Sequence, residues 1–105
     1  MARRITLREV PLAIQNRREF TAGAGTMFGD YDSYGEHAGK YVIRSYRAVI
    51  ATVTFGKDNE EVVWVTDRNY TVTTSKHTTY ARRGFAVELA NALAEQANAD
   101  PLALV

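Results

Sequence analysis

The chain has 105 residues, a net charge of +1 and no cysteine. Its length is that of one ordinary domain, so we expect a single domain over 1–105, and the lack of cysteine excludes a disulfide scaffold and a thiolate metal site. A hydrophobic share of 46% and a charged share of 24% are typical of a globular protein, and no apolar run approaches the ~20 residues that cross a bilayer. We therefore expect a cytoplasmic protein with no membrane partner, no bound metal and no cofactor.

The first predicted element is a helix over residues 6–20. Thr6-Leu7-Arg8-Glu9 fits a capping box, and Leu7, Val10 and Ile14 then recur at helical spacing. Pro11 leaves two starting points open, because proline disrupts a helix interior and is accepted in a first turn.

Residues 21–39 form the second segment, which we interpret as a glycine-rich loop. Five of the seven glycines fall here, and no periodicity runs through the segment. Phe28, Tyr31 and Tyr34 argue against full disorder, because aromatic side chains usually pack or bind something.

A sheet follows over residues 40–73, and a long helix over 75–97 ends the chain. The predicted strands alternate β-branched and aromatic residues, and their short connections favour an antiparallel meander of three or four strands. Ser75 is the expected N-cap of the last helix, whose apolar stripe would pack on the sheet. The predicted fold is α+β with two layers.

The junction between sheet and last helix is the first candidate site. A helix start offers unpaired amides, and here hydroxyls and cations surround it. The nucleic-acid or anion-binding residues we predict are Thr74, Ser75, Lys76, His77, Arg82 and Arg83, with Arg17 and Arg18 as a second basic group. The alternative is a strand end followed by an N-cap and a solvated lysine, which the fold needs whatever the function.

His77 has two interpretations of its own. It is either a hydrogen-bonded structural residue or the general base of a metal-independent nuclease, which would need a partner such as His37. We expect the first, and so no enzyme.

A second candidate site would bind a protein. Tyrosine and arginine are enriched at protein–protein hot spots, and on an exposed sheet they can also stack on bases and bind phosphates. The partner-binding residues on this hypothesis are Phe28, Tyr31, Tyr34, Tyr46 and Arg47, and the partner would be a host protein or a second copy of the chain.

Several short motifs resemble those of a family of small proteins common in bacteriophage genomes, especially phages of actinobacteria. The motifs lie within residues 7–83 and are Asn16-Arg17-Arg18-Glu19-Phe20, Ser45-Tyr46, Ile50-Ala51, Trp64-Val65-Thr66 and Tyr70-x-Val72-Thr73-Thr74-Ser75-Lys76-His77. Thr78 and Ala48-Val49 depart from the family, which often has Gln after the His and Thr-Pro before the Ile-Ala. The resemblance implies a phage origin and a bacterial host cytoplasm, without implying an activity.

Our first expectation is association with a nucleic-acid backbone, and the alternative is a protein-interaction module that inhibits or redirects a host factor. The placement of the arginines separates these two hypotheses. If Arg3, Arg4, Arg17, Arg18, Arg82 and Arg83 share one face, a nucleic-acid partner is favoured, since affinity for nucleic acid comes mainly from phosphate contacts. If they are scattered, protein interaction is favoured.

Overall fold

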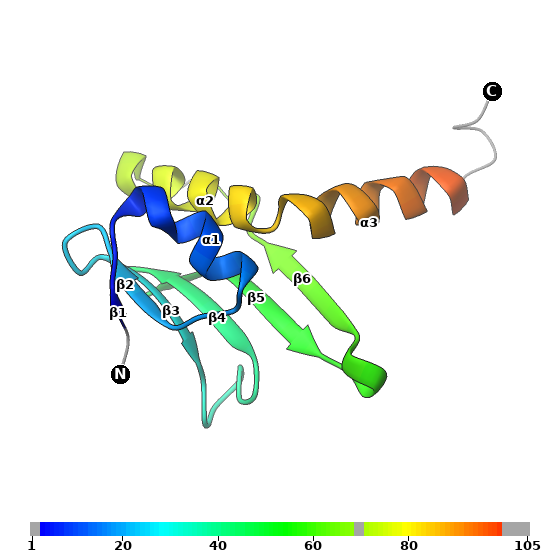
Figure 1. The fold of residues 1–105 in the computed structure, drawn as a ribbon, viewed down its shortest axis with the longest axis horizontal. Coiled ribbons are helices and arrows are strands. Elements are labelled where there is room, and N and C mark those ends of the chain that lie inside the picture. Colours follow the sequence, from blue (N-terminus) through cyan, green and yellow to red (C-terminus); the bar gives the residue numbers. More distant parts are fainter. Residues whose placement is uncertain (1–2, 69–70, 100–105) are drawn as a thin grey trace.

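The computed structural model describes residues 3–68 and 71–99, which form a six-stranded sheet and a layer of helices (Figure 1). The strands lie in the order of the chain; β1 is parallel to β2 and every later pair is antiparallel. In chain order the elements are β1 (Arg3–Arg4), the 3-10 helix η1 (Leu7–Glu9), α1 (Val10–Gln15), β2 (Phe20–Ala22), β3 (Met27–Tyr31), β4 (Tyr41–Ser45), β5 (Ala48–Phe55), η2 (Lys57–Asn59), β6 (Glu61–Val65), α2 (Val72–Gly84) and α3 (Ala86–Ala99). The α+β class is confirmed, and the sheet is larger than the predicted one.

The N-terminal predictions were only partly right. The capping box is present, because the Thr6 amide donates to the Glu9 carboxylate at 2.9 Å. The predicted helix over 6–20 was too long: it ends at Gln15, and Phe20 already belongs to β2. Residues 21–39 were wrongly read as a loop, since they contain the rest of β2 and all of β3.

The C-terminal helix also differs from its prediction. It starts at Val72, and Thr71 caps it by accepting a hydrogen bond from the Thr74 amide at 3.4 Å, so Ser75 is not the N-cap. The sheet predicted over 40–73 extends too far, because β6 ends at Val65 and residues 72 and 73 already belong to α2; residues 69 and 70 lie outside the described residues. The helix over 75–97 is two helices, and α3 extends away from the sheet (Figure 1).

The core lies between the helices and one face of the sheet. Every second residue of the strands packs there against α1 and α2. A β-bulge in β5 brings Ile50 to the same side. The largest buried members are Tyr41, Phe20, Phe85, Ile14, Met27, Ile43 and Ile50. The alternate strand residues point to the opposite side of the sheet, away from this core and the helices. We call this side the second face of the sheet.

Candidate functional site

The predicted junction site is a buried polar cluster in the structure. Ser45, at the end of β4, donates a hydrogen bond from Oγ to Thr74 Oγ1 at 3.0 Å, and the same oxygen lies 2.7 Å from Nδ1 of His77. All three residues are at most 5% exposed. Burial lowers the pKa of His77, and the nearby Lys76 ammonium lowers it further. The cluster therefore holds a neutral imidazole between sheet and helix.

This burial bears on the nuclease hypothesis. A general base must reach the proton that it abstracts, and the exposed fraction of His77 is only 1%. The turn between β2 and β3 closes over the ring, because a Cβ added to Gly23 would stand 3.3 Å from Nε2. Among the residues that the structure describes, His37 makes its only ion pair with Glu36, in the β3–β4 loop. The two histidines therefore do not form a pair.

The cations of α2 point elsewhere. Arg82 donates to the carbonyl of Thr66 at 2.9 Å, and the Arg83 guanidinium lies 5.3 Å from the ring centre of Tyr80. Lys76 is exposed. Ser75 and Arg82 line a shallow hollow of about 260 Å³ that Asp67 and Arg68 also border. Of the predicted junction residues, Thr74 and His77 thus belong to the buried cluster and Ser75 and Arg82 to this hollow, while Lys76 and Arg83 belong to neither.

The neighbouring Arg17 and Arg18 have opposite surroundings. Arg17 has a left-handed φ of 52°, and its guanidinium bonds Glu61 of β6 at 3.0 Å and Glu88 of α3 at 2.9 Å. It also lies 5.1 Å from the centre of the Phe85 ring. Two carboxylates therefore occupy Arg17, while the structure gives Arg18 no such pair within 3–68 and 71–99.

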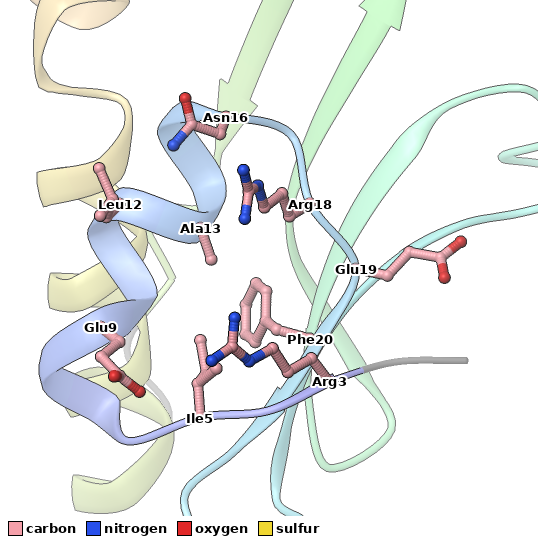
Figure 2. A pocket seen from close by; sticks show the side chains of 9 residues that line it. All are labelled: Arg3, Ile5, Glu9, Leu12, Ala13, Asn16, Arg18, Glu19 and Phe20. Atoms are coloured by element: carbon pink, nitrogen blue, oxygen red, sulfur yellow. The ribbon is translucent and has the colours of Figure 1, made fainter.

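Arg18 instead lines a pocket of about 230 Å³ between β1, β2 and α1. Figure 2 shows the guanidinium groups of Arg3 and Arg18 directed into this pocket near the Phe20 ring. Ile5 and Ala13 complete the apolar part of the lining. Both arginines belong to the basic N-terminal part of the sequence, but it is the pairing of β1 with β2 that places Arg3 and Arg18 at the same pocket.

The six arginines of the placement test do not share one face. Arg3 and Arg4 form β1, the first strand of the sheet. Arg82 bonds Thr66, directly after β6, the last strand. The two groups therefore lie at opposite edges of the six-stranded sheet.

The residues predicted for protein binding are also dispersed. Tyr31 donates its hydroxyl to the carbonyl of Arg17 at 2.7 Å and packs against Tyr41. Tyr34 is 86% exposed in the β3–β4 loop, and Tyr46 and Arg47 are exposed in the β4–β5 turn. Phe28 alone lies on the second face of the sheet.

That second face carries apolar side chains that the prediction missed. The strand register places Phe28 beside Arg44, Val42 beside Thr52, and Thr52 beside Trp64. Trp64 is 49% and Val62 is 58% exposed. We call the set Phe28, Arg44, Val49, Val62 and Trp64 the open face; Val42 and Thr52 lie on the same side of the sheet but are buried, at 1% and 6% exposure. The sequence of β6 could not reveal it, because Val62 and Trp64 alternate with the equally apolar Val63 and Val65.

Comparison with protein families places the chain. A model of a family of unknown function (DUF8033) matches residues 9–90, and the chain belongs to that family. Comparisons with curated proteins and with solved structures gave no match. The phage origin stays a prediction, since the family description says nothing of it.

Two further features concern possible ligands and surroundings. Within residues 3–68 and 71–99, no group of three or more histidine, aspartate or glutamate side chains is arranged to hold a metal ion. In the same part of the chain, no helix is long and apolar enough to cross a membrane.

Proposed function

We propose that the protein is a protein-interaction module that binds its partner through the open face. The observation that carries this proposal is the exposure of Trp64 and Val62 on the side of the sheet away from the helices. An antiparallel sheet with one free face normally shows polar side chains there. Exposed apolar side chains grouped on one face are typical of an interaction surface.

The charge of the open face supports a protein partner over a nucleic acid. Arg44, beside Phe28, pairs with Asp32 through two hydrogen bonds of 3.0 and 2.7 Å, and the other arginine on this side of the sheet, Arg4, lies on the edge strand β1. The Arg44 guanidinium is therefore already paired with a carboxylate and is not free to contact a phosphate. Tryptophan is also among the side chains most often found at hot spots, in centres that exclude water.

The placement of the other arginines supports the same choice. A phosphate backbone is bound by several cations on one surface, and here Arg3 and Arg82 lie at opposite edges of the sheet. Arg17 is held by Glu61 and Glu88. Nucleic-acid association therefore has less support than protein binding, and the burial of His77 weighs against nuclease activity.

The test places a photo-crosslinking amino acid at position 62 and, as a control, at position 72. Val72 is a matched control because it is an exposed valine, 88% accessible, at the start of α2. The bait is the full chain in a lysate of the source organism, or of the host if the gene is phage-borne, after nuclease treatment. We expect one protein to crosslink at position 62 and not at 72.

Binding to the purified partner then measures the contribution of the face. The chain contains one tryptophan, so the emission of Trp64 reports burial of the face directly. Val62→Ser should weaken binding at least about tenfold, the equivalent of ~1.4 kcal/mol, and Val72→Ser should leave it unchanged. Crosslinks that vanish with nuclease, or that are equal at both positions, would refute the proposal.

A further inference from the structure

The pocket between β1, β2 and α1 joins two cations to an apolar lining. Arg3 and Arg18 direct their guanidinium groups into it, and Ile5, Ala13 and Phe20 supply the apolar part (Figure 2). Among the residues that the structure describes, neither guanidinium has a hydrogen-bond or ion-pair partner. Two uncommitted guanidinium groups at one pocket favour an anion, because arginine binds carboxylates through paired, charge-assisted hydrogen bonds.

The backbone fixes the positions from which both arginines reach. The Arg18 amide donates to the carbonyl of Ala13 at 2.9 Å, and the Arg18 carbonyl accepts from the hydroxyl of Tyr41 at 2.6 Å. Arg3 is paired with Phe20 across the parallel β1–β2 contact. The fold therefore fixes the backbone positions of the two arginines before a ligand arrives, while their exposed side chains are ordered only on binding.

Two carboxylates also border the pocket, and neither forms an ion pair with Arg3 or Arg18 among the residues that the structure describes. Glu9 accepts a hydrogen bond from the Thr6 amide at 2.9 Å as part of the capping box. Glu19 points away from the pocket (Figure 2).

We infer that this pocket binds an organic carboxylate with a short apolar body. The carboxylate would lie between Arg3 and Arg18, and the apolar body would rest on the partly exposed Ile5 and Ala13, because the Phe20 ring is itself only 1% exposed. The volume of about 230 Å³ suits a group of the size of one side chain and is below that of a drug-sized site. Such a group is either a free organic acid or the last residue of a peptide. The pocket is remote from Trp64, so this inference and the proposed function fail or hold separately.

The experiment is a titration of the full chain followed by backbone amide shifts in NMR spectra. The probes are 3-phenylpropionate, its uncharged amide, and a short peptide ending in phenylalanine with a free or an amidated C-terminus. We expect the acid to shift the amides of Ala13 and Phe20 with a Kd on the order of millimolar, and the amide to bind about tenfold more weakly. A peptide that binds more tightly than the free acid would identify a chain terminus as the ligand, and the reverse order a small acid.

Variants separate the two cations from a general charge effect. Arg3→Gln and Arg18→Gln should each weaken binding of 3-phenylpropionate about tenfold, while Arg47→Gln, at an exposed arginine of the β4–β5 turn, should not. Unchanged amide spectra away from the pocket show that each variant is folded. Equal affinity for the acid and its amide, equal binding by all three variants, or no shift at Ala13 and Phe20 at about 20 mM probe, well above a millimolar Kd, would overturn the inference.

Discussion

The Oγ atom of Ser45 lies 2.7 Å from Nδ1 of His77, and this contact joins the end of β4 to the second turn of α2. When Ser45 donates to Thr74, its oxygen accepts the Nδ1 proton of a neutral imidazole. A charged imidazolium could donate from Nδ1 in the same way, so it is the burial of the ring, at 1% exposure, that makes protonation of His77 unfavourable.

The stability of the protein should fall as the pH is lowered from about 7 to 5. The pKa of His77 is below its ordinary value of 6.5 in the folded chain, because burial disfavours the charged ring. As the pH falls, this histidine is protonated in the unfolded chain before it is protonated in the folded chain. The contribution of the neutral His77 ring to stability is therefore complete above the unfolded pKa and is lost as the pH falls toward the folded pKa. Urea unfolding across this range measures the slope.

The slope should be smaller in His77→Gln and unchanged in His37→Gln, which alters the other histidine. Ser45→Ala should in addition cost about 1–2 kcal/mol at neutral pH, because it leaves the buried ring nitrogen unpaired. A slope that survives the loss of His77 would show that another group titrates in this window.

Arg17 and Arg18 should differ in their effect on stability although they are adjacent. Arg17→Gln removes the cation that bridges Glu61 and Glu88, and the Arg17 side chain is only 12% exposed. We expect a loss of about 1–3 kcal/mol in the free energy of unfolding, less than for a fully buried pair because both carboxylates are about one-third exposed.

Arg18→Gln is the matched control for that change. It removes the same charge from a side chain without an ion pair among the described residues, so its cost should stay within about 0.5 kcal/mol. Equal losses in urea unfolding of the two variants would mean that the bridge contributes nothing specific.

The different surroundings of these two arginines also show where sequence reasoning ends. Both belonged to one predicted basic group, and only the left-handed backbone at Arg17 separates their side chains. This φ belongs to the end of α1, where the Arg17 and Arg18 amides donate to the carbonyls of Ile14 and Ala13 at 2.9 Å, as in a Schellman motif. The partners of Arg17, Glu61 and Glu88, are distant in the sequence, and local patterns do not contain that information.

Patterns succeeded where one local signal dominated. The capping box at Thr6 and the alternation of β5 predicted real elements, and together they gave the α+β class. They failed at Thr73 and Thr74, because threonine has a high β-propensity and tertiary context overrides it. The glycines hid β3, where Gly29 leaves room for the Phe20 ring and the hydroxyl of Tyr41.

The start of α2 can be tested by two identical substitutions. Thr71→Ala removes the side chain that accepts from the Thr74 amide, and an N-cap of this kind contributes about 1 kcal/mol. Thr73→Ala lies in the exposed first turn of the same helix and should change stability by less than about 0.5 kcal/mol. A helix that began at Ser75 would give no cost at Thr71, and thermal unfolding of the two variants decides between the two starts.

Gly84 should tolerate a methyl group poorly, against the usual preference of helices. Alanine is favoured over glycine in a helix by about 1 kcal/mol, so helix propensity alone predicts that Gly84→Ala stabilises the protein. In the structure a Cβ at this position would stand 2.7 Å from Cβ and Cγ2 of Ile14 and 3.2 Å from the carbonyl of Pro11. Because Ile14 is fully buried and cannot move aside, we expect a net loss of about 1–3 kcal/mol.

Gly56→Ala is the control for that prediction. Its backbone is extended, with φ of −98°, and the nearest atom to an added Cβ is 3.7 Å away. Alanine gives the unfolded chain less conformational freedom than glycine does. At this position the substitution should therefore leave the free energy of unfolding unchanged or raise it by up to about 1 kcal/mol. If α1 and α2 pack as closely as the structure has them, urea unfolding shows a lower free energy of unfolding for Gly84→Ala and an unchanged or higher one for Gly56→Ala. A stabilised Gly84→Ala would mean that the two helices lie further apart.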